Sequence, residues 1–209
     1  MDYVEFKEVF KNIREQMVNN KEYLIELDQQ NGDGDLGISM VNGYNGVCDF
    51  LASTDIRDLG MLAMKSASVF NEAAPSSLGT ITSFGLMGMA RALKGKEAAS
   101  LNEVIDALEA GLNKIMEKAK SKPGEKTIID ALYPAIEVLK NNRELDVKEA
   151  FRLASDAAAK GSESTKDMLS VHGRAAYYGE KSLGVLDGGS VVGRLIFEGI
   201  YNYLSNDNV

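Results

Sequence analysis

Apolar residues recur at helical spacing along most of the chain. Between residues 6 and 24 they lie three, four or seven positions apart, with an interruption near Asn20, and similar stripes cover residues 101–116 and 147–158. This periodicity predicts amphipathic helices, and clear strand-like alternation is absent from the sequence. Turn-forming residues separate the stripes, so we expect about eight helices, mostly of about 12 to 22 residues, joined by short loops.

Short loops between helices place consecutive helices antiparallel to one another. The predicted fold is therefore all-α: a single-domain, up-and-down antiparallel helical bundle or barrel that covers residues 1–209. A chain of 209 residues with 44% hydrophobic composition is large enough to bury one substantial core. No linker, low-complexity tract or convincing internal repeat divides it.

Composition narrows the possible functions. A net charge of −8 argues against a nucleic-acid-binding surface, although not against a nucleotide whose charge is carried by metal ions. Cys48 is the only cysteine, so no internal disulfide can form, and a reducing compartment is indicated. Neither a signal-peptide core nor an apolar run long enough for a membrane helix is present in the sequence. We therefore expect a cytoplasmic protein that contacts no membrane.

Three aspartates are crowded together where the first helical stripe ends. Asp28, Asp33 and Asp35 lie in the glycine-rich segment LDQQNGDGDLGISM. Carboxylates without a neighbouring cysteine or histidine suit a hard cation such as Mg²⁺. On spacing alone, an acidic helix cap with additional turn aspartates remains an alternative. A calcium EF-hand does not fit, because the sixth loop position is Leu36 rather than glycine and the twelfth is Asn42 rather than glutamate.

Four further segments are suited to phosphate binding when they are considered together. Residues 36–39 begin the next predicted helix, and free N–H groups at a helix start attract phosphate. Residues 75–80 form a hydroxyl-rich turn before a helix expected at 81–93, while residues 123–130 and 173–190 contain two more helix starts. Each turn alone is typical of a capped loop. With the aspartates they would surround a phosphate with metal, amides and one cation. Neither a P-loop nor a dinucleotide-binding glycine motif occurs in the sequence.

These segments, in this order, resemble the nucleotide-binding L subunits of bacterial dihydroxyacetone kinases. The run from Asp28 to Gly37 is close to the aspartate pattern of that family. PGEKT at residues 123–127 looks like the family's P-G-D-K-T, and GRAAYYGEKS at residues 173–182 looks like its G-R-A-S-Y-L-G-E-R-S. The resemblance spans nearly the whole chain.

The resemblance implies an eight-helix antiparallel barrel that holds ADP or ATP at one end through two Mg²⁺ ions. By position, Asp28, Asp33 and Asp35 would be the metal ligands, and no further catalytic residue is implied. Backbone amides at 36–39 would contact the phosphates, residues 77–79 the phosphates or ribose, and Ile128 the adenine, while the last segments would close the site. The implied nucleotide-binding residues are Leu36, Gly37, Ile38, Ser39, Ser77, Leu78, Gly79, Ile128, Arg174, Asp187, Gly188 and Gly189.

The function that the resemblance implies is that of a phosphotransferase subunit. Its bound nucleotide would act as a coenzyme that relays phosphate, from a phosphocarrier M-type subunit, to dihydroxyacetone or a similar small ketose held on a separate K-type subunit. Phosphoryl transfer depends mainly on positioning and charge neutralisation, which metal-bound aspartates supply.

Two alternatives to the kinase hypothesis remain. One is a non-catalytic module that senses nucleotide or metal and regulates a partner, and the other is a helical structural protein with acidic caps. The sensor is motivated by departures from the family pattern: Leu36 stands where histidine is frequent, SSLG at 76–79 replaces Gly-Ala-Ser-Gly, and VLDGG at 185–189 replaces His-x-Asp-Pro-Gly.

Other charged residues receive more modest interpretations. His172, the only histidine, is expected at the surface or a helix end, with contact to nucleotide or partner as the alternative. A local run of lysines predicts a solvated face, with assistance to phosphate binding or docking of an acidic partner as the alternative. The run consists of Lys114, Lys118, Lys120, Lys122 and Lys126.

Overall fold

Helices make up nearly all of the regular structure. Within residues 1–206, which the computed structural model describes, the chain forms nine α-helices, two 3₁₀ helices and no β-strand. The α-helices are α1 (Tyr3–Asn19), α2 (Lys21–Asp28), α3 (Leu36–Ser53), α4 (Leu59–Ala73), α5 (Ser77–Ala92), α6 (Leu101–Ala119), α7 (Ile129–Asn141), α8 (Val147–Ser164) and α9 (Gly188–Ser205). The 3₁₀ helices are η1 (Thr165–Asp167) and η2 (Arg174–Ser182).

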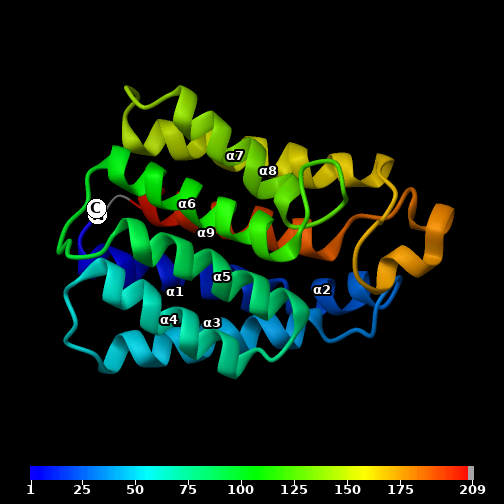
Figure 1. The fold of residues 1–209 in the computed structure, drawn as a ribbon, viewed down its shortest axis with the longest axis horizontal. Coiled ribbons are helices and arrows are strands. Elements are labelled where there is room, and N and C mark those ends of the chain that lie inside the picture. The colour runs from blue at the N-terminus through cyan, green and yellow to red at the C-terminus, as the bar shows by residue number, and fades with distance from the viewer. Residues whose placement is uncertain (207–209) are drawn as a thin grey trace.

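The α-helices form a closed antiparallel ring (Figure 1). Each helix packs against its neighbours in sequence, and α1 packs against α9 to complete the ring. The interruption predicted near Asn20 is real: α1 ends there, and α2 continues in the same direction as an extension of the same stave. Counting α1 and α2 together, the barrel has eight staves, so the predicted up-and-down all-α architecture is confirmed.

The antiparallel order sorts the helix starts between two ends of the barrel. Helices α1, α4, α6 and α8 start at the end where both chain termini lie, here called the terminal end (Figure 1). Helices α3, α5, α7 and α9 start at the opposite end, which also contains the last turn of α2 and is here called the aspartate end. Residues 168–187, here called the strap, connect η1 to α9 at the aspartate end and include η2.

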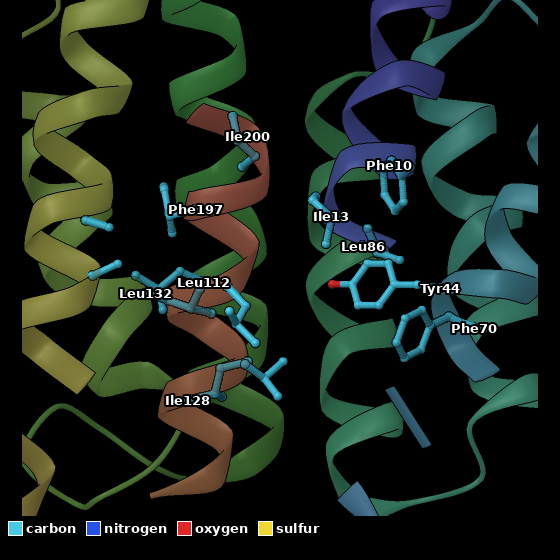
Figure 2. Close-up of a cluster of buried hydrophobic side chains, with 14 of the residues drawn as sticks. Phe10, Ile13, Tyr44, Phe70, Leu86, Leu112, Ile128, Leu132, Phe197 and Ile200 are labelled. Atoms are coloured by element: carbon cyan, nitrogen blue, oxygen red, sulfur yellow. The ribbon is translucent and has the colours of Figure 1, made fainter. Parts of the chain in front are cut away.

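A continuous hydrophobic cluster fills the barrel and surrounds a central cavity of about 390 Å³. Figure 2 shows Phe10, Tyr44 and Phe70 on one side of the cluster and Leu132 and Phe197 on the other. The Tyr44 and Phe70 rings meet edge to face with centroids 5.0 Å apart. Burial raises the pKa of the Tyr44 phenol well above its usual value. Cys48 is buried in the core, as is common for an unpaired cysteine.

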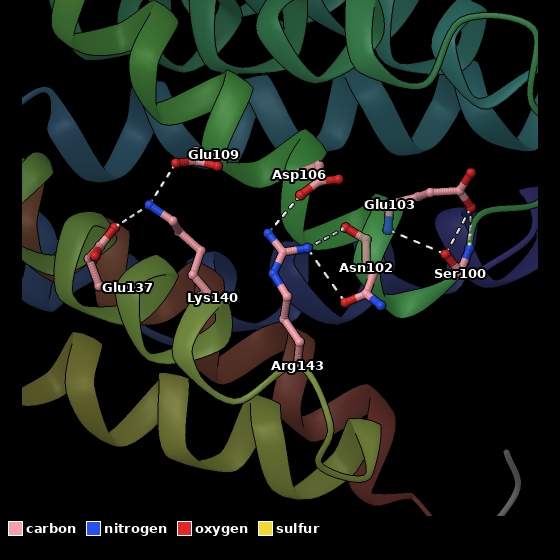
Figure 3. A network of polar contacts seen from close by, with 8 residues as sticks. All are labelled: Ser100, Asn102, Glu103, Asp106, Glu109, Glu137, Lys140 and Arg143. Atoms are coloured by element: carbon pink, nitrogen blue, oxygen red, sulfur yellow. Dashed lines mark hydrogen bonds and ion pairs between the residues drawn. The ribbon is translucent and has the colours of Figure 1, made fainter.

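Polar contacts also join neighbouring staves. Figure 3 shows the junction of α6 and α7, where the Lys140 ammonium lies 2.6 Å from Glu109 Oε1 and the Arg143 guanidinium lies 2.7 Å from Asp106 Oδ1. These pairs are partly solvated, so each contributes little more than about 1 kcal/mol. Among the helices of residues 1–206, none is both long enough and apolar enough to cross a membrane.

Candidate metal and nucleotide site

The three predicted metal ligands lie together at the aspartate end. Asp28 is the last residue of α2, Asp33 lies in the following turn, and Asp35 immediately precedes α3. One carboxylate oxygen from each residue lies within 4.8 Å of the others. Asp28 Oδ2 accepts hydrogen bonds from the backbone N–H groups of Gly34 at 2.8 Å and Asp35 at 3.1 Å, so the turn wraps around the Asp28 carboxylate.

Two glycines make this wrapped turn possible. Gly34 has a φ of +77°, in the left-handed region that residues with a side chain rarely adopt. A Cβ atom on Gly32 would lie only 2.2 Å from Asp28 Oδ1. The glycines of the segment therefore let the backbone approach the carboxylate that organises it.

The electrostatics of the cluster favour a bound cation. The pKa of Asp35 is raised, first by partial burial and then by the negative charges of Asp33 and Asp28, while Arg174 acts in the opposite direction. The Arg174 guanidinium from the strap lies 2.8 Å from Asp33 Oδ2 and offsets part of this negative charge. Three clustered carboxylates accessible to solvent are a donor set that fits Mg²⁺.

The first turns of α3 and α5 meet beside the aspartates. Within the described residues, the Asp35 side chain does not cap α3, so the amides of its first turn are left for another acceptor. The hydroxyls of Ser39 and Ser76 lie 2.6 Å apart and connect the two helix starts. Among the residues predicted to contact phosphate through this turn, Leu36, Gly37 and Ser39 are buried and Ile38 is exposed.

The position of α5 corrects one expectation. The sequence predicted a turn through residue 80 and a helix from 81, but α5 begins at Ser77, so Ser77, Leu78 and Gly79 form its first turn. The reason is a side-chain cap, since Ser76 Oγ accepts a hydrogen bond from the Gly79 N–H at 3.0 Å. These residues therefore present a helix start to the site instead of a loop.

The first turn of α9 contacts the starts of both α3 and α7. Asp187 caps α9, because its Oδ2 accepts a hydrogen bond from the Ser190 N–H at 2.6 Å. A Cβ atom on Gly188 would lie 2.5 Å from Leu36 Cδ2, and one on Gly189 would lie 3.3 Å from the backbone nitrogen of Ile128. Small residues at 188 and 189 therefore let three helix starts come together.

The Asp187 carboxyl has a strongly shifted pKa. Burial is the largest cause and raises the pKa to about 7, although the hydrogen bond from Ser190 lowers it. The negative charges of Asp130 and Asp28 raise it, and the Lys126 ammonium lowers it. A carboxyl group whose pKa lies near neutral pH is typical of binding and catalytic sites.

Ile128 differs from the other predicted nucleotide-binding residues. Its side chain is only 3% exposed and lies in the hydrophobic cluster with Leu112, Leu132 and Phe197 (Figure 2). It also lines the central cavity instead of facing the open aspartate end. Contact between Ile128 and an adenine ring stays a prediction that requires the base to reach into the barrel.

Lys126 corrects the expectation of a solvated lysine face. Its side chain is only 4% exposed, and the ammonium donates hydrogen bonds to backbone carbonyls at both ends of the strap. Its backbone lies in the left-handed region, with a φ of 59°. Neither feature is visible in hydropathy, and the only sequence signal was its place in the PGEKT segment. Lys122, four residues earlier, is exposed as predicted.

His172 is half-buried, and its ring forms a specific contact between the strap and the loop before α7. Its Nε2 lies 2.7 Å from Glu125 Oε2, and this contact is the main cause of the lowered pKa of the Glu125 carboxyl. The histidine therefore helps to attach the strap to the barrel, a role for which the sequence held no signal.

A closed helical barrel with a carboxylate cluster beside several helix starts defines a class of protein suited to Mg²⁺ and phosphate. Residues 30–202 match the family described as the DAK2 domain. The chain is 31% identical over 185 residues to the ADP-binding subunit DhaL of PEP-dependent dihydroxyacetone kinase 1 from Listeria innocua, across 88% of this chain and 87% of that protein. It is 29% identical over 171 residues to the ADP-binding subunit DhaL of the PEP-dependent dihydroxyacetone kinase from Escherichia coli, across 81% of each chain.

A solved structure has the same fold. The crystal structure of the dihydroxyacetone kinase from C. freundii in complex with AMP-PNP and Mg²⁺ matches with a TM-score of 0.74 and 22% identity. The match covers 94% of this chain and 33% of that kinase, so the present chain corresponds to about a third of it. The chain belongs to the DAK2-domain family. The resemblance drawn from its sequence is confirmed, as is the prediction of a kinase-type subunit.

Proposed function

We propose that this chain is the nucleotide-binding subunit of a dihydroxyacetone kinase and that it holds Mg²⁺ with ADP or ATP at the aspartate end. The observation that carries the proposal is the cluster of Asp28, Asp33 and Asp35 directly before the uncapped start of α3. Carboxylates for a metal and free amides for a phosphate are the two parts that a magnesium nucleotide requires. Relatives named as ADP-binding subunits support the same ligand.

The chain's residues would divide the work of holding the nucleotide. Asp28, Asp33 and Asp35 would hold two magnesium ions, and the first turns of α3 and α5 would direct their amides at the phosphates. Arg174 on the strap and the α9 start at 187–189 would close the site. Magnesium, when bound, neutralises phosphate oxygens and orients them for in-line transfer.

The acceptor in this proposal lies on another protein. The chain covers most of the two bacterial ADP-binding subunits but about a third of the C. freundii kinase, so the rest of such a kinase corresponds to residues outside this chain. We propose that a K-type subunit holds dihydroxyacetone or a similar small ketose. We also propose that a phosphocarrier M-type subunit regenerates the nucleotide in place. The relatives' description as PEP-dependent supports a phosphocarrier over free ATP.

One observation favours a second candidate, a nucleotide-sensing module. Leu36, at the position where histidine is frequent in the family, is only 8% exposed and packs against Gly188. An apolar contact therefore replaces a side chain that can bind phosphate or move a proton. A sensor would bind Mg-ADP but support no transfer.

Calorimetric titration of nucleotide-free protein with Mg-ADP tests the proposal. Wild type is expected to bind with a stoichiometry of one, and Asp28→Asn is expected to weaken binding by roughly 100-fold, because it removes the negative charge of a metal ligand and leaves only a neutral acceptor for the turn. Asp55→Asn, which changes an exposed aspartate at the terminal end, is the matched control and should bind like wild type. A wild-type protein that ignores Mg-ADP would end the proposal.

Reconstitution separates the kinase from the sensor. Wild type is mixed with a K-type subunit, a phosphocarrier and dihydroxyacetone, and sugar phosphate is measured. Formation of sugar phosphate that depends on this chain supports the kinase, whereas tight nucleotide binding without product favours the sensor.

A further inference from the structure

A single buried ammonium group holds both ends of the strap. Lys126 Nζ donates to the carbonyl oxygens of Thr165 at 2.7 Å and Met168 at 3.1 Å, which precede or begin the strap. The same nitrogen donates to the carbonyl oxygens of Ser182 at 2.6 Å and Val185 at 2.7 Å, near the end of the strap. An ammonium has three N–H groups, so four acceptors share three donors.

The positive charge is what makes this arrangement stable. Carbonyl oxygens that converge on one point repel one another, and a cation at that point converts the repulsion into charge-assisted hydrogen bonds. Within residues 1–206, no carboxylate forms an ion pair with Lys126, so the carbonyls are its main compensation for burial. Burial lowers the pKa of Lys126, while the more distant charges of Asp187 and Asp167 raise it. A neutral side chain here would leave four carbonyls facing one another.

The strap carries residues that the proposed site needs. Arg174 pairs with Asp33 of the metal cluster from the middle of the strap, and the side chain of that arginine is 69% exposed, so it is held mainly by this pair and by the strap backbone. Asp187 at the end of the strap caps α9 and donates its N–H to Thr165 Oγ1 at 3.0 Å. Contacts at the strap ends therefore determine where Arg174 and Asp187 lie.

We infer that Lys126 is a positioning residue for nucleotide retention: its ammonium pins both ends of the strap and so keeps Arg174 and Asp187 over the bound nucleotide. The effect of Lys126 on nucleotide retention rests on the proposed function. Its effect on the position of the strap does not. Lys126 acts through the strap, because its ammonium is directed at four backbone carbonyls.

The first experiment needs no nucleotide. Hydrogen exchange followed by mass spectrometry compares wild type with Lys126→Met, which keeps a long apolar side chain and removes the charge. Peptides from residues 168–187 are expected to exchange about tenfold faster or more in the variant, while peptides from α1 and α6 are expected to be unchanged. Lys122→Met, at an exposed lysine of the same loop, is the matched control and should exchange like wild type.

The second experiment measures both the equilibrium affinity and the release rate of a fluorescent ADP analogue in the presence of Mg²⁺. If the strap is ordered in only about 1 to 10% of Lys126→Met molecules, the apparent dissociation constant rises about 10- to 100-fold, because only ordered molecules bind fully. Lys122→Met should again release nucleotide like wild type. If Lys126→Met does not fold, Lys126→Gln, which keeps hydrogen-bond donors without charge, replaces it in both experiments.

A chemical rescue tests the charge separately from the volume of the side chain. Lys126→Ala removes three methylene groups and the ammonium, which propylammonium ion can replace. Propylammonium is expected to restore slow strap exchange and slow nucleotide release, whereas propanol of similar size is expected to restore neither. Rescue by both would mean that Lys126 fills space and would overturn the inference. Rescue by neither would mean that an ammonium at this position does not hold the strap and would overturn it as well.

The remaining outcomes are also decisive. Wild-type strap exchange and wild-type nucleotide release in Lys126→Met would overturn the inference and leave the proposed function intact. Equal acceleration in strap and barrel peptides would assign Lys126 to general stability and overturn it too. If wild type itself binds no Mg-ADP, the inference falls together with the proposed function, and the failure is visible in the wild-type titration instead of the variants.

Discussion

Four helices start at each end of the barrel, but the two ends differ in how the first-turn N–H groups of these helices are satisfied. At the terminal end a side chain caps every one of the four, and the capping residues are Asp2, Asp58, Ser100 and Asp146. At the aspartate end Ser76 and Asp187 cap α5 and α9, whereas α3 and α7 lack a side-chain cap at the N-cap position within the described residues. At α7 the first-turn amides are still satisfied, because the Ile129 N–H donates to Thr127 Oγ1 and the Asp130 N–H donates to the Thr127 carbonyl. The free amides of the aspartate end are therefore those of α3, beside the cluster of carboxylates.

The contrast between the two ends indicates where the sequence has favoured stability and where it has favoured binding. Capping is worth about 1 kcal/mol per helix, and repulsion among clustered carboxylates costs stability until a cation arrives. An aspartate end that gives up caps and crowds three negative charges is therefore less stable alone than the terminal end. Functional sites commonly carry such a cost.

Glycine substitutions should affect stability at the terminal end and ligand binding at the aspartate end. The largest expected effect is a loss of stability at the terminal end. A Cβ atom on Gly60, in the first turn of α4, would lie 2.6 Å from Lys94 Cα and 2.7 Å from Ala90 O, both backbone atoms. Because the backbone cannot move aside cheaply, Gly60→Ala should lower the free energy of unfolding by about 3 kcal/mol, measured by urea denaturation. Mg-ADP affinity should be unchanged below the unfolding transition.

Gly85→Ala is the matched control for this substitution. Gly85 is also helical, but its added Cβ would meet only the end of the Ile115 side chain at 3.0 Å. A flexible side chain can shift, so this variant should lose much less stability. Equal losses in the two variants would contradict the explanation.

Gly32→Ala should show the opposite pattern at the aspartate end. Its Cβ atom would lie 2.2 Å from Asp28 Oδ1 and 2.9 Å from the Asp28 backbone oxygen, so the carboxylate must be displaced and the turn must shift slightly. A surface turn can shift with less cost to the fold than the helix contact at Gly60. Mg-ADP affinity should fall roughly 10- to 100-fold in calorimetry, because the displaced group orients the metal cluster. The free energy of unfolding measured with EDTA should change by less than about 1 kcal/mol. A large loss of stability with unchanged Mg-ADP affinity would contradict the distinction between the two ends.

The barrel itself could be predicted from the sequence because it depends on local patterns. Apolar stripes at helical spacing defined the helices, and short loops fixed their antiparallel order. The interruption near Asn20 marked the boundary between α1 and α2. The start of α5 was predicted four residues late, because the pattern gave more weight to the small residues of 75–80 than to the cap that Ser76 provides.

The candidate site was predictable only in part. The aspartates were visible because their crowding is unusual in sequence, and the structure brings them together. Lys126 was not, because its burial depends on carbonyls from residues 39 to 59 positions away that converge only in the folded chain. The η2 segment of the strap is short and mostly polar and is interrupted by non-helical backbone at Gly179, so the sequence did not predict a 3₁₀ helix there.

The two ends should also respond to pH in opposite directions. At the aspartate end, the pKa of Asp187 is raised from 3.8 to about 7, so the folded state binds its proton more tightly than the unfolded state. Its contribution is present below about pH 4 and is lost as pH rises to about 7. Because Asp187 as a whole residue is only half-buried, solvent screening should reduce the loss to about 1.5 kcal/mol, less than the full shift implies.

Asp187→Asn should remove this pH dependence, because asparagine still caps α9 but does not titrate. Unfolding free energies are measured between pH 4 and pH 7 in EDTA without nucleotide, so that no metal alters the titration. Asp146→Asn, which changes the corresponding cap of α8 at the terminal end, is the matched control. Wild-type and Asp187→Asn profiles that stay parallel would contradict the assignment.

The smallest effect is expected from the capping box of α6 at the terminal end. Glu103 accepts hydrogen bonds from Lys96 Nζ at 2.6 Å and from the Ser100 N–H at 2.7 Å, and these bonds lower its pKa to about 2 (Figure 3 shows the Ser100 contacts). A lowered pKa gives stability that is present above pH 4.5 and is lost as pH falls through about 2, the reverse of Asp187.

Glu103→Gln keeps the capping box but loses the charge that faces Lys96. Its melting temperature should therefore be slightly below that of wild type at pH 7 and equal to it near pH 2, since only the ionised carboxylate gains from these contacts. A deficit that persists at pH 2 would show that the side chain acts through its shape, and the contrast in pH response between the two ends would then depend on Asp187 alone.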